Sequence, residues 1–233
     1  MEVIGPAGLA AAGGLAGYAV RGRSSSIFAP SVYHGNRSRP ALALTFDDGP
    51  SESTPALLDI LAAHGVRATF FMCGRNIRRL PGVARQVAAA GHEIGNHTDT
   101  HPLLHFRSPV FVFRELALAQ ETIHLNTGTT PRFFRAPYGV RWFGLRQAQA
   151  RLHLTGVMWT LIARDWALPA NRIFQRVIRG ASNGGILCLH DGRRLQSAPD
   201  VRPMLDAVER AIPVLKDRGF QFQTMTEMAG SEA

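Results

Sequence analysis

Short apolar segments alternate with helical stretches over most of the chain, and this alternation restricts its fold more than any other feature. Apolar, β-branched and aromatic runs predict seven strands, at 42–46, 67–72, 92–96, 133–135, 154–158, 185–189 and 220–224. Helical stretches are predicted between them, at 53–63, 76–90, 112–125, 142–151, 171–180 and 203–215. Strands that are separated by helices pair in parallel through right-handed crossovers. The sequence therefore predicts an α/β fold of one domain, a distorted (β/α)7 barrel.

The N-terminal segment differs in composition from this domain. Residues 1–22 are largely apolar and long enough to cross a bilayer, which indicates a signal anchor or transmembrane segment and makes a membrane an expected partner. Gly17 and Ala19 are typical of a cleavage site and favour a domain that faces the cell envelope. Arg21 and Arg23, at the far end, would instead keep the domain in the cytoplasm. We expect a membrane-associated protein, with the envelope side favoured and the orientation left open.

The amino-acid composition indicates where the domain begins and which kinds of partner are expected. Residues 23–39, rich in Ser, Arg, Gly and Pro, predict a linker, which places the domain at 40–233. The net charge of +9 would suit an anionic partner, but Lys216 is the only lysine and the arginines are scattered, so no nucleic-acid partner is expected. Cys73 and Cys188 lack metal-ligand spacing and are interpreted as buried thiols.

Polar side chains follow the predicted strands at the points where the strands end. They are Asp47, Asp48, His97, Arg135, Asp165 and His190. The carboxyl ends of the strands form the active-site face of a βα barrel, so we expect these side chains on one face of a single catalytic domain. The adjacent carboxylates Asp47 and Asp48 repel each other unless a cation or a shared proton relieves them. A metal ion is the simplest relief.

Asp48, His97 and His101 are the predicted metal ligands. The two imidazoles are four residues apart and can face one point if the segment turns helically. Two histidines and a carboxylate would leave positions on a zinc-like ion for water and substrate. Each part alone also fits a plainer interpretation, either two solvated histidines on a helix or an ordinary polar turn at Asp47 and Asp48. Their joint occurrence at strand ends favours the metal site.

Five motifs resemble, in order and approximate spacing, those of one known family. They are TFDDGP at 45–50, HTDTH at 97–101, RAPY at 135–138, the pair Asp165-Trp166, and GGILCLHD at 184–191. Over about residues 40–226, the chain resembles the polysaccharide deacetylases, also called carbohydrate esterase family 4 or the NodB homology domain. The resemblance implies a distorted seven-stranded βα barrel and a metal-dependent removal of N-acetyl groups from amino sugars.

The resemblance also implies roles for individual residues. Asp47 matches the general base, and Asp48, His97 and His101 match the metal ligands. Arg135 matches the arginine that holds the base. Zinc is the expected metal, and cobalt or nickel would suit similar nitrogen and oxygen ligands.

A second group of residues matches the general acid of the family and the residues that support it. His190 matches the general acid, and a neighbouring carboxylate can tune the pKa of a histidine near neutrality. Asp165 matches that carboxylate. Arg67 occupies the place of the cation that tethers Asp165.

Three residues are expected to contact the substrate, and two positions depart from the family pattern. Pro137 and Tyr138 form a rigid turn, in which Tyr138 would offer its backbone N–H to the oxyanion and its ring to the sugar. Trp166 would wall the acetyl pocket. Ile162 stands where the family has an aspartate, and Cys188 stands where it has a leucine. Neither departure falls on an expected ligand, base or acid, so we expect activity to survive.

The expected function is hydrolysis of N-acetyl groups on polysaccharides that contain N-acetylglucosamine, such as a cell-wall glycan or a chitin-like oligomer. Two alternatives stay open. One is a deformylase or deacetylase of a lipid-linked amino sugar, which a membrane segment would suit. The other is a glycan-binding module that has the fold but no turnover.

Overall fold

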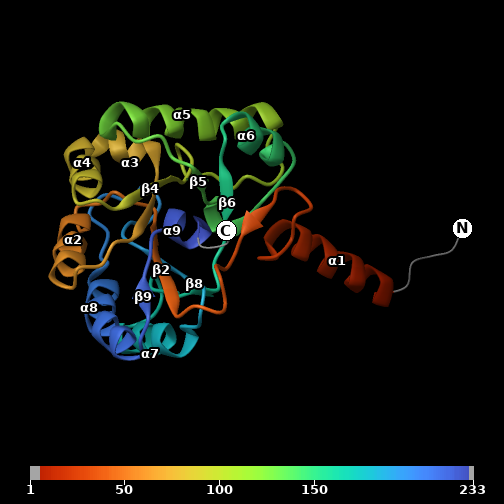
Figure 1. The fold of residues 1–233 in the computed structure, drawn as a ribbon. Helices are drawn as coiled ribbons and strands as arrows, with labels where there is room; N and C mark the ends of the chain where they lie inside the picture. The colour runs from red at the N-terminus through yellow and green to blue at the C-terminus, as the bar shows by residue number, and fades with distance from the viewer. Residues whose placement is uncertain (1–5, 231–233) are drawn as a thin grey trace, which may run out of the picture.

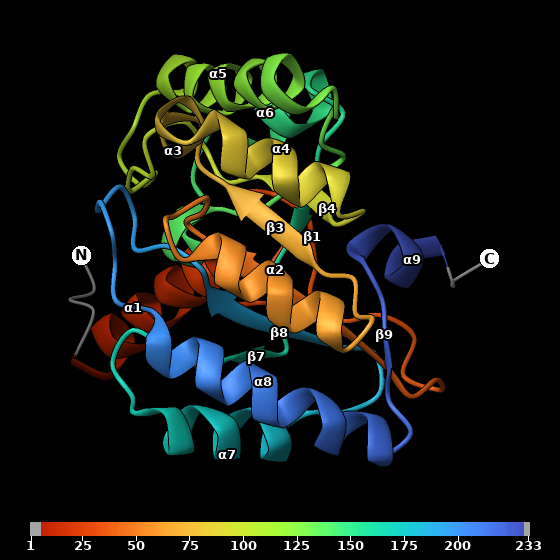
Figure 2. The same cartoon turned by 90° about the vertical axis from the view of Figure 1, so that its left-hand side faces the viewer.

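The computed structural model describes residues 6–230, which form one curled sheet of parallel strands with helices on its outer side (Figures 1 and 2). The strands are β1 (Ser31–Val32), β2 (Ala41–Asp47), β3 (Thr69–Met72), β4 (Glu93–Asn96), β5 (Phe133–Phe134), β6 (Thr155–Val157), β7 (Leu161–Ile162), β8 (Gly185–His190) and β9 (Gln221–Phe222). They pair in the order β1-β6-β5-β4-β3-β2-β8-β7, and β9 pairs with the start of β2. The predicted fold, a distorted (β/α)7 barrel in one domain, is confirmed.

Most of the helices follow a strand and cover the sheet from outside, whereas the first helix precedes the strands and extends away from the barrel. They are α1 (Pro6–Arg21), α2 (Thr54–Ala63), α3 (Gly74–Arg79), α4 (Pro81–Ala89), α5 (Pro109–Thr127), α6 (Leu145–Arg151), α7 (Ala170–Gly180), α8 (Arg202–Asp217) and α9 (Met225–Gly230), with a 3-10 turn at Pro137–Gly139. Figure 2 shows α2, α7 and α8 over the part of the sheet that holds β2 and β8, and α3, α4 and α5 beyond β3 and β4.

Strand β2 lies at the centre of the sheet and is buried along its whole length. Alternate residues of a strand face opposite sides. Leu42, Leu44 and Phe46 therefore pack in the core beneath the helices, whereas Thr45 and Asp47 point into the barrel toward Arg135. Because both faces of the strand are buried, its sequence is a continuous apolar run rather than an alternation of apolar and polar residues. The same geometry places a carboxylate inside the barrel.

The seven predicted strands are all present, and the differences lie in short or interrupted elements. Strands β1 and β7 were not predicted because two residues are too few to show a periodic pattern. The helix predicted at 76–90 is two helices, α3 and α4, which meet at Leu80. Pro81 lacks a backbone N–H and disfavours helical geometry at the residue before it, so it ends one helix and begins the next.

The predicted linker at 23–39 is wrong. Ser31 and Val32 form β1, which pairs in register with Gly156 and Val157 of β6. Ala29, just before it, is completely buried. The polar composition of this segment hid a strand whose backbone hydrogen bonds are supplied by the edge of the sheet.

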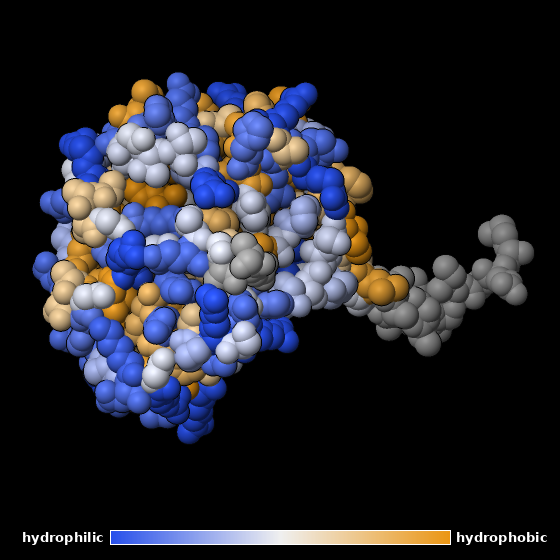
Figure 3. Space-filling view, in the orientation of Figure 1, coloured by the Kyte–Doolittle hydropathy of each residue, from blue (hydrophilic) through white to orange (hydrophobic). Residues whose placement is uncertain are grey.

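The predicted membrane segment at 1–22 gains no support from the structure. Residues 1–5 lie outside the described part of the chain. Among residues 6–230, no helix combines the length and the hydropathy that crossing a bilayer requires. In Figure 1, α1 extends away from the barrel, and its last turn contacts the domain through a hydrogen bond from the Arg141 N–H to the Val20 carbonyl. Figure 3 shows apolar surface at the edge of the domain where α1 leaves it.

Candidate active site

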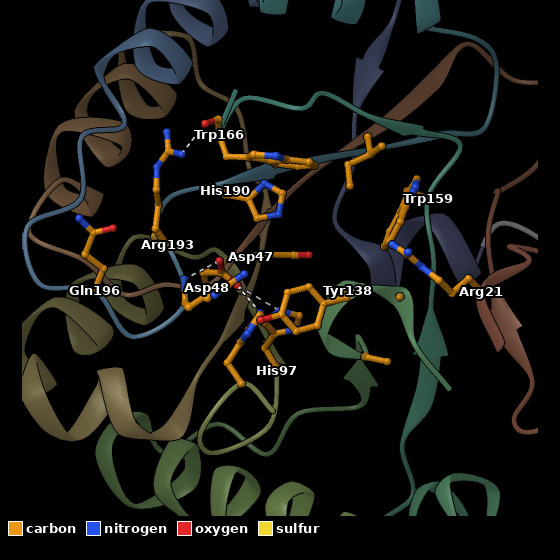
Figure 4. Close-up of a pocket in the computed structure, with 16 residues that line it drawn as sticks. Arg21, Asp47, Asp48, His97, Tyr138, Trp159, Trp166, His190, Arg193 and Gln196 are labelled. Atoms are coloured by element: carbon orange, nitrogen blue, oxygen red, sulfur yellow. Dashed lines mark hydrogen bonds and ion pairs between the residues drawn. The ribbon is translucent and has the colours of Figure 1, made fainter. Parts of the chain in front are cut away.

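Asp48, His97 and His101 converge at the carboxyl ends of β2 and β4 (Figure 4). Asp48 Oδ1 lies 2.9 Å from His101 Nε2 and 3.3 Å from His97 Nε2. The three potential ligand atoms all lie within 4.8 Å of one another, and the three residues are buried. The structure therefore brings together the three predicted metal ligands.

The loop that carries the histidines is not helical, so the expected helical turn is wrong. Thr98 and His101 adopt left-handed backbone angles, with φ of 66° and 53°. The Thr98 hydroxyl accepts the His101 N–H at 3.1 Å, and the Glu115 carboxylate accepts the N–H groups of Asp99 and Thr100 at 3.1 and 2.8 Å. A buried carboxylate on α5 thus holds an irregular loop in the conformation that turns both imidazoles to one point.

The donor set fits a divalent metal ion. Asp48 Oδ1 is buried, and neither imidazole contact gives it a hydrogen bond, as expected when all three atoms face a common ion rather than one another. Burial raises the pKa of Asp48, but the contacts with His101 and His97 outweigh burial and hold that pKa well below its usual value. His97 Nδ1 lies 2.7 Å from the Arg135 carbonyl, which leaves Nε2 free to ligate. Two nitrogen ligands and one oxygen ligand suit zinc, and cobalt and nickel also accept such a set.

Asp47 is held by Arg135 rather than by the metal set. Asp47 Oδ1 accepts a hydrogen bond from Arg135 Nη1 at 2.7 Å, and Oδ2 accepts one from Cys188 Sγ at 3.4 Å. Arg135 is completely buried and also donates to Thr45 Oγ1 at 2.8 Å. The buried carboxylate of Asp47 therefore has a cationic partner inside the barrel.

A second group of potential ligands, Asp47, Cys188 and His190, is less suited to a metal. Burial and the charge of Asp47 raise the pKa of the Cys188 thiol well above its usual value, so the thiol stays protonated. Asp47 is already paired with Arg135. A protonated thiol is a poor ligand, so this group is better suited to proton transfer.

His190 and Asp165 form a buried pair beside Asp47. The parallel pairing of β2 and β8 places His190 directly opposite Asp47. His190 Nδ1 lies 3.0 Å from Asp165 Oδ1, and its backbone N–H donates to Oδ2 at 2.9 Å. Burial lowers the pKa of His190, but the charge and hydrogen bond of Asp165, with smaller effects of Asp48 and Asp47, raise it to about 9. The imidazole is therefore a cation near neutral pH.

The expected role of Arg67 is wrong. Arg67 precedes β3, so it lies at the amino end of that strand, whereas the site lies at the carboxyl end. Its side chain is 58% exposed, and its guanidinium forms an ion pair with Glu227 of α9. Asp165 is instead held by the two nitrogen atoms of His190. The resemblance identified Arg67 by its position in the sequence, but the strand places this residue at the end opposite to the site.

The predicted substrate-contact residues lie at the mouth of the site. Tyr138, in the 3-10 turn after Pro137, has a left-handed backbone with φ of 58°, and its ring packs 4.8 Å from the ring of His101. Trp166 stands edge-on to His190 at 5.0 Å and is 45% exposed. Both aromatic rings thus flank the metal and proton-transfer groups.

These groups open into one cleft of about 470 Å³. Sequence reasoning missed five large side chains that line it: Arg21, Trp159, Arg193, Arg194 and Gln196. Figure 4 shows Arg21 and Trp159 on one side of the cluster, and Arg193 and Gln196 on the other. Only the sequence position of Arg193 and Arg194, just after the His190 strand, could have indicated them.

The fold and the polar cleft at its strand ends define a βα-barrel hydrolase. The model of the polysaccharide deacetylase family matches residues 34–157, which is more than half of the chain. The protein therefore belongs to the polysaccharide deacetylase family. The deacetylases of this family act on the N-acetyl amide bonds of polysaccharides and use a divalent metal ion. The family resemblance read from the five motifs is confirmed.

Relatives support this assignment over most of the chain. The chain is 37% identical to a chitooligosaccharide deacetylase of Bradyrhizobium over 194 residues, which is 79% of this chain and 89% of that protein. It is 31% identical to a peptidoglycan-N-acetylglucosamine deacetylase of Listeria monocytogenes over 89% of this chain, but spans only 42% of that longer protein. Among solved structures, the Bc1960 peptidoglycan N-acetylglucosamine deacetylase superposes with a TM-score of 0.80 at 31% identity, covering 85% of this chain and 92% of that one.

Proposed function

We propose that this protein is a metal-dependent hydrolase that removes N-acetyl groups from polysaccharides containing N-acetylglucosamine. The observation that carries the proposal is the convergence of Asp48, His97 and His101 within 4.8 Å, beside a separate carboxylate, Asp47, that is paired with Arg135. Such a site has a place for a divalent ion and a free base next to it. The relatives named as chitooligosaccharide and peptidoglycan deacetylases support the glycan class.

Asp48, His97 and His101 would hold the metal, with zinc as the proposed ion. When bound, such an ion would polarise the amide carbonyl and would lower the pKa of a water molecule to about 7. The rest of the reaction falls to the side chains of this chain. Each of these side chains either transfers a proton or contacts the substrate.

Asp47 is the proposed general base. It is paired with Arg135, and its position opposite His190 on the neighbouring strand puts it on the same side of the cleft as the proposed acid. The thiol of Cys188 donates only a weak hydrogen bond to Oδ2, so this oxygen remains available to accept a proton from the attacking water. Positioned general bases contribute about 10²–10⁴-fold to rates.

His190 is the proposed general acid. Its Nδ1 is occupied by Asp165, so the proton that leaves is the one on Nε2. The pKa of about 9 keeps the imidazole protonated at neutral pH, as protonation of the departing amine requires. Trp166, edge-on to the imidazole, would wall the acetyl group, and Tyr138 would contribute its ring to the sugar and its backbone N–H to the oxyanion.

The two departures from the family pattern leave this scheme intact. Ile162 ends β7 and lines the cleft, so it would give that wall an apolar contact in place of a carboxylate. Cys188 contacts the proposed base directly, so it would change the hydrogen bonding of Asp47 and the room near the acetyl group. We propose that both residues adjust substrate fit rather than the chemistry.

Acetate release tests the proposal. Purified protein is assayed with chitin oligomers, poly-N-acetylglucosamine and peptidoglycan, with and without a chelator. Acetate release that stops with the chelator and returns with zinc is the expected result. Tight binding of a glycan without acetate release would instead support the silent glycan-binding module, and release from a lipid-linked amino sugar alone would support the membrane-substrate alternative.

A matched pair of variants tests the base. Asp47→Asn should lower kcat by about 10²–10⁴-fold, because it removes a positioned general base. Asp59→Asn is the control, since Asp59 is exposed on α2 and the substitution is chemically the same. Equal activity of the two variants would refute the role of Asp47.

A further inference from the structure

Three guanidinium groups line the cleft without a carboxylate partner. Arg21, Arg193 and Arg194 all face the cleft, and none of them forms an ion pair within the described part of the chain. The other basic groups near the reaction centre, Arg135 and His190, are already paired with Asp47 and Asp165. Unpaired cations gathered around a substrate cleft favour a negatively charged substrate.

Arg193 is fixed by neutral acceptors. Nη1 donates to the carbonyl of Trp166 at 2.7 Å, and Nη2 donates to the carbonyls of Asp200 and Asp165 at 3.1 and 3.4 Å. The carboxylates of these two aspartates are taken by Arg202 and His190. The guanidinium of Arg193 is therefore held in place by carbonyl groups, without an ion pair of its own among the described residues.

Arg194 is fixed through its backbone. Its N–H donates to Asp48 Oδ2 at 2.7 Å, and its carbonyl accepts from Asn76 Nδ2 at 2.7 Å. The guanidinium carbon lies 5.3 Å from the centre of the Tyr138 ring, which itself packs on His101. A substrate sugar lying against Tyr138 would thus have this cation beside it.

Arg21 reaches the cleft from the opposite side (Figure 4). It is the last residue of α1 and lies before the stretch that the family model matches. The completely buried Arg141 anchors this segment, because its Nη1 donates to the Ser25 carbonyl at 2.6 Å and its Nη2 donates to the Gly22 carbonyl. The guanidinium of Arg23 also donates to the Thr160 carbonyl near Trp159. The N-terminal segment is therefore a fixed wall of the cleft.

We propose that the cleft binds an acidic glycan, in which a sugar next to the reacting N-acetylated sugar carries an oxyanion that the cleft-lining guanidinium groups of Arg21 and Arg194 recognise. The inference rests on the proposed deacetylase function and names its substrate class. Guanidinium groups bind carboxylates and phosphates with paired hydrogen bonds, so the shared chemistry is a sugar oxyanion of either kind. A neutral chitin oligomer would leave both cations without a partner.

The test compares substrates that differ only in charge. The acidic substrate is an oligosaccharide of alternating N-acetylglucosamine and N-acetylmuramic acid, whose lactyl group bears a carboxylate. The neutral substrate is the same oligosaccharide with that carboxyl group reduced to an alcohol. A third substrate, an N-acetylglucosamine oligomer with a phosphate monoester, distinguishes phosphate from carboxylate as the preferred oxyanion. The measured quantity is the ratio of kcat/KM for the acidic substrate to kcat/KM for the neutral one.

The ratio should be about 10–100 in the original protein, because a hydrogen bond to a charged group contributes this much to binding. Arg21→Gln and Arg194→Gln should each lower it by about tenfold, and added salt should lower it too. Arg114→Gln on α5 is the control, because Arg114 is exposed on a helix that covers the outside of the barrel, and it should leave the ratio unchanged. A ratio near one in the original protein, or a ratio that neither cleft variant changes, would overturn the inference.

Two further measurements distinguish failure of the proposed function from failure of the proposed acidic-glycan site. Absence of acetate release from every glycan would refute the proposed function. In that case the equilibrium binding of the acidic and reduced oligosaccharides to the chelator-treated protein still tests the charged subsite, and equal binding of both would refute it. Arg21→Gln could loosen the N-terminal segment, so its thermal unfolding is compared with that of the original protein. The Arg194 contacts with Asp48 and Asn76 are made by the main chain, so Arg194→Gln keeps them.

Discussion

Replacing Asp165 with asparagine should lower the pKa of His190 and remove a pH-dependent part of the protein's stability. Burial alone lowers the pKa of His190, and the charge and hydrogen bond of Asp165 are the main groups that raise it to about 9. Asparagine has nearly the same shape but no charge, so the pKa should fall toward or below the ordinary value of 6.5. The His190 side chain is only 17% exposed, so water screens the interaction little.

The size of the effect follows from linkage. A pKa raised from 6.5 to about 9 corresponds to about 3 kcal/mol, at about 1.36 kcal/mol per pKa unit. Because the folded protein holds this proton more tightly than the unfolded chain does, the stabilisation is fully present below pH 6.5 and is lost as the pH rises through about 9. The difference in unfolding free energy between the original protein and Asp165→Asn should therefore shrink by about 3 kcal/mol over this range.

Two measurements on metal-free protein check this reasoning. Proton NMR of the imidazole C–H resonances gives the pKa of His190, which is assigned with His190→Gln. Urea unfolding at pH 6 and pH 10 gives the stability difference. Asp206→Asn is the control, since Asp206 is an exposed partner of Arg210 on α8. A His190 pKa that stays near 9 in Asp165→Asn, or a stability difference that does not change with pH, would refute the argument.

Three further changes test the metal set, the buried ion pair and the departure in the fifth motif. Asp48→Asn removes the anionic ligand, so the affinity for zinc should fall by more than about 100-fold, because losing a residue that only supports a ligand already costs up to about that much. The metal content after dialysis measures this affinity loss. Retained metal would contradict the assignment of Asp48 as a ligand. Arg135→Met leaves the buried Asp47 carboxylate unpaired and should lower the unfolding free energy by about 3–5 kcal/mol in urea titrations, whereas a loss below about 1 kcal/mol would show that Asp47 is neutral. Cys188→Leu should cost about 1–3 kcal/mol of stability by crowding the buried site, and a stabilised variant would show unfilled space beside the base.

The sequence was sufficient to predict the barrel and most of its chemistry because both depend on where strands end. Asp48 directly follows the β2 strand, and His97 directly follows β4, so parallel pairing alone brings them to one edge of the sheet. Asp47 and His190 are in the same position on paired strands and face each other in register. No long-range information beyond strand order is needed to place these four side chains together.

Other features depend on contacts that a linear pattern does not contain. The loop that turns His101 to the metal set is held by Glu115, a residue of α5 that no motif indicated. Arg67 was assigned to the site by its motif, but it lies at the amino end of β3 and pairs with Glu227 from the end of the chain. Contacts of this kind depend on which helix packs beside which strand in the folded protein.

The sequence by itself predicted the parallel barrel and the polar residues that follow its strands, because apolar periodicity indicates the strands and each strand end fixes the position of the residue that follows it. Only the tertiary structure decided the walls of the cleft. Arg21 is separated from Asp48, a proposed metal ligand, by an apparent linker, yet β1 pairing and the buried Arg141 bring it to the site. Backbone hydrogen bonds to a sheet edge and to a buried guanidinium do not depend on the side chains of the segment they hold, so its composition could not reveal them.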